Sequence, residues 1–149
     1  MLLECGPKKW LLSCLFLIVF VVAPLRVTSQ SSTAYAPPPG STERKEILDI
    51  FRNNFKKNLH VDVIFVVGHF KIKNGWAWIE VTGQSKDGQN RYEPMEALLH
   101  KTKGTWKIID YAPGECTGDE EDSPDCNPKH LFKTLRSKYK APPEIFPAN

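Results

Sequence analysis

The chain between residues 42 and 58 has apolar side chains at helical spacing. These positions recur every three or four residues, and the charged residues between them fall on the other side of a helix. This pattern predicts one amphipathic helix, begun by a cap at Ser41 or Thr42 and turned toward a core. The apolar set is Ile47, Leu48, Ile50, Phe51 and Phe55.

From Val61 onward the period of the apolar pattern changes to two, which predicts β-strands. The phase of this alternation shifts after Gly68, as it does at a β-bulge. Asn74-Gly75 then separates two β-rich runs, and this dipeptide is the strongest short signal for a two-residue hairpin turn. We therefore expect a tight hairpin with Lys73 opposite Trp76.

The hairpin register fixes which side chains share a face of the sheet. One face carries the apolar set that should meet the helix, namely Phe70, Ile72, Ala77, Ile79 and Val81. The other face presents two tryptophans among lysines, which predicts an aromatic recognition surface. Its candidate ligand contacts are Trp76, Trp78, Lys71 and Lys73. Two alternatives stay open: the lysine stems cover the indoles, or the C-terminal segment folds over them.

The remaining elements complete an α+β pattern. A third strand is expected at about residues 93–101, with Pro94 at an edge or entry position, and a fourth at 105–111. Asn127-Pro128 opens a short helix through about residue 139. The tail after this helix offers Ile145 and Phe146 for packing. The fold class predicted is α+β, with an N-terminal helix on a four-stranded antiparallel meander and a short C-terminal helix after a disulfide loop.

The first 29 residues have the features of a signal peptide. Lys8 and Lys9 precede an apolar run from residue 10 to residue 22, which is within the usual ~7–15 residues. We place cleavage after Ser29 and expect a secreted or periplasmic protein, with an uncleaved anchor as the alternative. A Pro/Ser-rich linker at 30–40 and a single domain at 41–149 would follow.

Export makes Cys116 and Cys126 the only cysteines of the mature protein, and we expect them to form a disulfide. The loop that they close, CTGDEEDSPDC, carries five acidic residues. It lacks the residue order of an EF-hand, so a solvated acidic loop is favoured over a specific cation site. No metal site is predicted.

The charge of the mature chain argues against nucleic acid and anionic membranes as partners. Removing the leader from 20 basic and 17 acidic residues leaves 17 and 16, a net charge of +1. A field this weak predicts neither nucleic acid nor an anionic membrane as the partner of the whole domain.

The pattern of the mature chain resembles known folds. The strand pair that ends in GTWKIIDY is similar to the closing strands of the NTF2-like and cystatin-like folds. The stretches FVVGHFKIKNGWAWIEV, EALLHKTKGTWKIID and APPEIFP resemble small exported bacterial proteins without an assigned activity. The resemblance implies a helix across a curved sheet and no catalytic motif.

The chain contains no HExxH, GxSxG or phosphate-binding glycine loop. We therefore expect an exported, non-catalytic module without a cofactor that binds a protein or envelope ligand. An inhibitor-like role falls within this class, and the tryptophan face could also join two copies of the chain. The alternative is an NTF2-like enzyme with a pocket between helix and sheet, using His69 or His100 with Asp110 for acid–base work.

Overall fold

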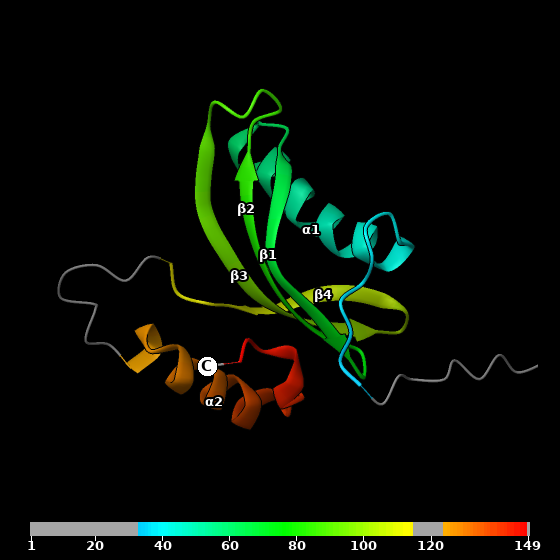
Figure 1. The fold of residues 1–149 in the computed structure, drawn as a ribbon, viewed down its shortest axis with the longest axis vertical. Helices are drawn as coiled ribbons and strands as arrows, with labels where there is room; N and C mark the ends of the chain where they lie inside the picture. The colour runs from blue at the N-terminus through cyan, green and yellow to red at the C-terminus, as the bar shows by residue number, and fades with distance from the viewer. Residues whose placement is uncertain (1–32, 115–123, 149) are drawn as a thin grey trace, which may run out of the picture.

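The computed structural model describes residues 33–114 and 124–148. The helix α1 (Thr42–Leu59) precedes four strands, β1 (Ile64–Lys73), β2 (Trp76–Gln84), β3 (Arg91–Thr102) and β4 (Thr105–Tyr111). The helix α2 (Pro128–Tyr139) lies between two short 3-10 turns, η2 (Pro124–Cys126) and η3 (Pro143–Ile145). This order confirms the predicted α+β arrangement (Figure 1). The leader and most of the acidic loop lie outside the described residues.

The four strands form one antiparallel meander in the order β1-β2-β3-β4. The hairpin between β1 and β2 has the predicted register, with Lys73 paired to Trp76 and Lys71 to Trp78. Asn74 and Gly75 at its turn have φ angles of 51° and 75°. Two positive φ values in succession are those of a type I′ turn, whose twist matches that of the strands.

One irregularity in strand pairing occurs where the sequence predicts it, and two others were not predicted, between Thr82 and Gln84 of β2 and between Leu98 and Leu99 of β3. The register of β1 against β2 shifts between Val67 and His69, which confirms the bulge at Gly68. Pro94 lies in β3 opposite Thr82 of β2, but β4 pairs with β3 only from Ala97 onward. Pro94 therefore stands where β3 has no β4 neighbour, a position that tolerates a residue without an N–H group.

The first core lies between α1 and one face of the sheet. Ile47 and Phe51 of α1 are fully buried there, together with the apolar set predicted for this face. Ser41 caps the helix, because its Oγ accepts a hydrogen bond of 3.3 Å from the backbone N–H of Arg44. Helical spacing and a cap were thus sufficient to predict α1. We name the buried cluster between α1 and the sheet the α1 core: Ile47, Leu48, Phe51, Phe70, Ile72, Ala77, Ile79, Val81, Ala97, Leu99 and Trp106.

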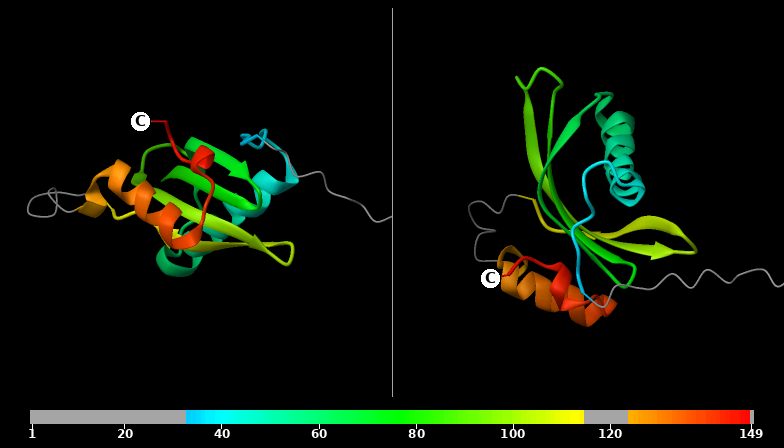
Figure 2. Two further views of the ribbon diagram at one scale, coloured as in Figure 1. Left: turned by 90° about the horizontal axis from the view of Figure 1, so that it is seen from below. Right: turned by 45° about the vertical axis from the view of Figure 1, so that its right-hand side comes forward.

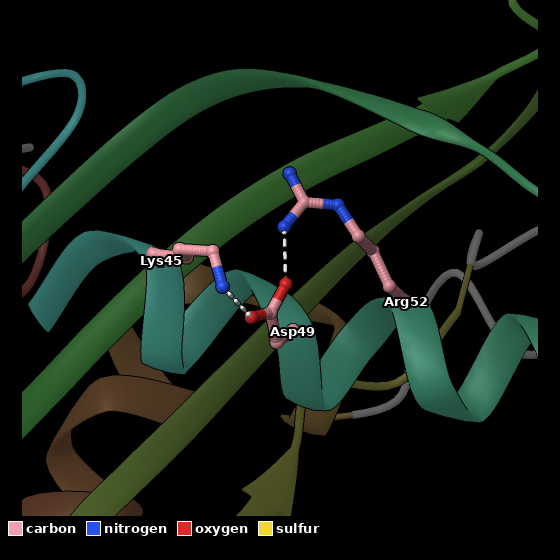
Figure 3. A network of polar contacts seen from close by, with 3 residues as sticks. All are labelled: Lys45, Asp49 and Arg52. Atoms are coloured by element: carbon pink, nitrogen blue, oxygen red, sulfur yellow. Dashed lines mark hydrogen bonds and ion pairs between the residues drawn. The ribbon is translucent and has the colours of Figure 1, made fainter. Parts of the chain in front are cut away.

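The outer side of α1 carries a charged network (Figure 3). Asp49 accepts from Arg52 at 2.6 Å and from Lys45 at 3.2 Å. These bonds, the one from Arg52 first, hold the pKa of Asp49 below its usual value. Because Lys45 is exposed and Asp49 and Arg52 keep more than a third of their side-chain surface in water, each pair is expected to contribute only about 0.3–0.5 kcal/mol to stability.

A second core lies on the opposite face of the sheet, under α2 and the tail that follows it (Figure 2). Phe132 and Leu135 of α2, with Ile145 and Phe146 of the tail, cover Trp78 and other sheet residues. The predicted packing of the C-terminal helix and tail is thereby confirmed. We name this interior the α2 core: Trp78, Leu98, Phe132, Leu135, Ala141, Ile145 and Phe146.

The end of the predicted linker packs on the domain. The backbone of Tyr35 exchanges two hydrogen bonds, of 3.0 and 2.8 Å, with Ile72 at the edge of β1. Pro37 is fully buried, and its carbonyl accepts from Arg44 at 3.0 Å. Proline-rich composition predicted no helix here, but it did not exclude an extended segment that packs on the domain.

Candidate functional site

Trp78 of the predicted recognition surface is buried completely in the α2 core. Its indole contacts the rings of Phe132 and Phe146, with centroids 5.3 and 5.2 Å apart. This is the alternative in which the C-terminal segment folds over the tryptophan face. The side chain of Trp78 is thus a core residue, and the prediction that it is exposed for ligand contact is corrected.

The other residues of that surface are partly engaged within the protein. Trp76 is half-buried and stacks on His100, with ring centroids 4.1 Å apart. The Lys73 ammonium contacts the Glu144 carboxylate at 2.7 Å, which ties β1 to the tail. Lys71 is half-buried on the same face. Among the four predicted contacts, Trp76 and Lys71 are partly exposed, and Lys71 forms no ion pair with the described residues.

Within the described residues, no hydrogen bond joins either histidine of the predicted acid–base pocket to Asp110. The ring Nε2–H of His69 donates to the Ile145 carbonyl at 2.8 Å, and His100 stacks on Trp76. Asp110 accepts from the Tyr139 hydroxyl at 2.8 Å. Burial raises the pKa of Asp110, but the bonds from Tyr139 and Lys138 outweigh it and hold the pKa below its usual value. Each group thus has a structural partner of its own.

The α2 core covers only part of its sheet face. Farther along the strands the same face carries Ile64 and Val66, whose exposed fractions are 42% and 44%. Both are paired with β2, Val66 opposite Thr82 and Ile64 opposite Gln84. In Figure 1 neither helix lies over this part of the face. We name it the open sheet face and define it by six residues: Ile64, Val66, Glu80, Thr82, Pro94 and Glu96.

The open sheet face ends at an edge strand. β1 pairs with β2 on one side only, and the Tyr35–Ile72 bridge is the single isolated bridge found in the described residues. An edge strand that carries exposed apolar side chains is a template for pairing with another chain. Sequence reasoning did not single out Ile64 and Val66. Their signal was the continuous apolar run VIFVV, which indicates a strand that is apolar on both faces.

Two carboxylates lie side by side on the open sheet face. Glu80 of β2 is paired directly with Glu96 of β3. Burial, and secondarily the charge of Glu80, raises the pKa of Glu96. A cavity of about 450 Å³ borders Glu96 where β3 continues beyond the end of β4, and it is lined also by Glu93, Tyr111 and their neighbours. The carboxyl group of Glu96 therefore holds its proton to a higher pH than a solvent-exposed glutamate does.

The described residues contain neither a metal-binding cluster nor a membrane-spanning helix. No group of three or more His, Cys, Asp or Glu side chains there could hold a metal ion, and no described helix is long and apolar enough to span a bilayer. Cys126 lies in η2, whereas Cys116 and the residues from Asp119 to Asp122 lie outside the described part of the chain. The disulfide therefore stays a prediction.

Comparison of the chain with protein-family models, with curated proteins and with solved structures finds no significant match.

Proposed function

We propose that this protein is an exported, non-catalytic module that binds an extended segment of a protein ligand along the β1 edge. The observation that carries the proposal is the exposure of Ile64 and Val66 on an edge strand, beside a sheet face that neither described helix covers. Strand addition gains affinity from main-chain hydrogen bonds and specificity from pockets for alternate side chains. An inhibitor-like role falls within this class.

The chain itself uses this mode of pairing at one point. Tyr35 adds to β1 as a short antiparallel bridge at Ile72, which supports the view that the edge accepts an extended segment. The stretch of β1 from Ile64 to Gly68 is N-terminal to that bridge and ends at the bulge. A ligand strand along this stretch would cover the apolar side chains of Ile64 and Val66 and remove them from water.

The location and the fold family are part of the same proposal. Export rests on the leader, with its charged start, short apolar run and small residues before the cleavage point. An NTF2-like or cystatin-like assignment is supported by the order of one long helix followed by a four-stranded antiparallel meander. The enzyme alternative needs a pocket between α1 and the sheet, and the side chains of the α1 core are packed together there. A hollow of about 420 Å³ between the end of α1 and the start of β3 contains none of the residues predicted for acid–base work.

The test is selection of extended peptides from a random display library on the secreted protein, followed by titration of the selected peptides against variants. Val66→Lys places a charge at the edge and should weaken binding at least tenfold, which is about 1.4 kcal/mol. Leu59→Lys is the matched control, because Leu59 is an aliphatic residue that is 54% exposed on α1. Its affinity should stay within about twofold of wild type.

The same experiment can refute the proposal. Amide hydrogen exchange of the bound complex should show new protection in β1, because added main-chain hydrogen bonds slow exchange. If no peptide is enriched, or if the two lysine variants bind alike, the β1 edge is not the ligand site. Circular dichroism and thermal unfolding of both variants exclude loss of folding as the cause.

A further inference from the structure

The outward surface of α2 carries cations in a regular stripe. Lys129, Lys133, Arg136 and Lys140 are all exposed, and they follow one another at intervals of four, three and four residues. This spacing places Lys129, Lys133 and Arg136 along one side of α2, and Lys140, the left-handed C-cap residue, follows directly after the helix. With a rise of about 1.5 Å per residue, the stripe is roughly 16 Å long.

Three of these cations surround one shallow hollow. Lys133, Arg136 and Lys140 line it together with Ser137, Ala141 and Pro143, and its volume is about 640 Å³. We name it the basic hollow. Its walls supply positive charge and a hydroxyl group, whereas Ala141 and Pro143 supply apolar atoms. The volume is within the usual ~300–1,000 Å³ of small-ligand sites.

The cations of the hollow form no ion pair within the described residues, although the charge of Arg136 helps to lower the pKa of Glu144 after the bond from Lys73. Within the described residues, an ion pair joins Lys138 of α2 to Asp110, and none involves Lys133, Arg136 or Lys140. A cation near the C-terminal end of a helix is favoured by the helix dipole, which accounts for Arg136. It does not account for Lys129, which lies in the first turn, where no acidic residue is present.

The surroundings of the hollow decide the class of anion that fits it. Single-stranded nucleic acid needs exposed aromatic rings for stacking, but Phe132 is buried and the hydroxyl of the half-buried Tyr139 is bonded to Asp110. A membrane-bound amphipathic helix needs a free apolar side, but the apolar side of α2 is packed against Trp78. A chain of sugars with acidic groups needs only spaced cations and a small apolar patch.

We propose that the basic hollow binds an anionic polysaccharide, with Lys133, Arg136 and Lys140 contacting its sulfate or carboxylate groups. Arg136 can form a bidentate pair with either group, whereas the lysines act as point charges. The exposed Pro143 would contact the apolar side of a sugar ring. This site is separate from the β1 edge, so it does not depend on the proposed function.

The test is binding of the secreted protein to heparin and to polygalacturonate at about 0.15 M salt, where weak surface attraction is screened. The probe variant replaces the three cations of the basic hollow with glutamine. The control variant makes the same change in net charge at three other exposed lysines, Lys57→Gln, Lys86→Gln and Lys107→Gln. Titration calorimetry should show at least tenfold weaker binding for the probe variant and less than twofold for the control.

Several outcomes would overturn the proposal. One is equal loss in both variants, which would indicate attraction by net charge alone. Another is the absence of wild-type binding to both polysaccharides. Tighter binding to a single-stranded DNA oligomer or to phosphatidylglycerol vesicles, lost in the same probe variant, would replace the polysaccharide by that ligand class. The Val66→Lys variant should bind heparin as wild type does, so failure of the β1 proposal remains distinguishable.

Discussion

Replacement of Trp78 by alanine distinguishes a core tryptophan from a surface one. In the structure its side chain has no exposed area, and it is enclosed by Phe132, Phe146 and other members of the α2 core. Truncation of a buried tryptophan costs about 3–5 kcal/mol, from lost apolar burial and from the cavity left behind. Since a domain of this size is stable by roughly 5–15 kcal/mol, Trp78→Ala should lose a large part of its stability.

Two companion variants sharpen this prediction. Trp76→Ala removes a half-buried ring that stacks on His100, so it should cost only about 1 kcal/mol. Trp78→Phe keeps an aromatic ring and removes the indole N–H, which is buried without a hydrogen-bond partner in the described structure. Leaving such a donor unsatisfied costs about 1–3 kcal/mol. Removal of this unsatisfied N–H should offset part of the stability lost with the packing. The loss of stability in Trp78→Phe should therefore be less than half of that in Trp78→Ala.

The assay is urea unfolding at 25 °C, followed by far-ultraviolet circular dichroism, for wild type and the three variants. A shift of the midpoint with an unchanged slope reports stability alone. The reasoning is refuted if Trp78→Ala costs less than about 1 kcal/mol, or no more than Trp76→Ala. In that case α2 does not cover Trp78, and the tryptophan face returns as a candidate recognition surface.

Three further predictions concern a turn, a carboxyl group and the cysteines. Gly75→Ala should lower the free energy of unfolding, measured in urea, by about 1–2 kcal/mol, because Gly75 has a φ of 75° that disfavours a side chain. A loss below about 0.5 kcal/mol, on the order of measurement error, would contradict this. Glu96→Gln should be more stable than wild type at pH 7, with the difference closing near pH 4. The reason is that the raised pKa of Glu96 makes its ionised form unfavourable, so wild-type stability falls as the pH rises from the usual value of 4.5 through the raised one; a less stable variant at pH 7 would show that Glu96 gains more from its contacts than it loses by burial. Replacing Cys116 and Cys126 by serine should cost about 2–4 kcal/mol, and thiol titration of the unreduced protein should find no free thiol; a full count of two thiols would rule out the disulfide.

The elements that could be predicted from the sequence depend on rules between near neighbours. Asn74-Gly75 specifies its turn locally, and the turn then specifies every pair of the β1–β2 hairpin up to the bulge at Gly68. Ser41 and the spacing of the apolar residues likewise place α1 to within one residue of the predicted end. In each case the residues that decide the structure lie within a few positions of one another.

The candidate site could not be predicted in the same way, because its residues are decided by contacts far apart in sequence. The alternation of β2 shows that Trp78 and Ala77 lie on opposite faces, but it does not show that both faces are covered. Phe132 and Phe146, which cover Trp78, follow it by more than 50 positions. α2 and the tail do not extend over Ile64 and Val66, because the part of the sheet that they cover depends on where α2 docks.

The sequence by itself therefore determined the helices, the meander, its hairpin register and the apolar side of each element, since hydrophobic period, caps and turn residues act locally. Only the tertiary structure decided which apolar side chains are covered. α2 and the tail bury Trp78 and tie His69 and Lys73 to the C-terminal segment, and they leave the β1 edge open. The physical reason is that burial is a property of two surfaces in contact, and a single strand specifies only one of them.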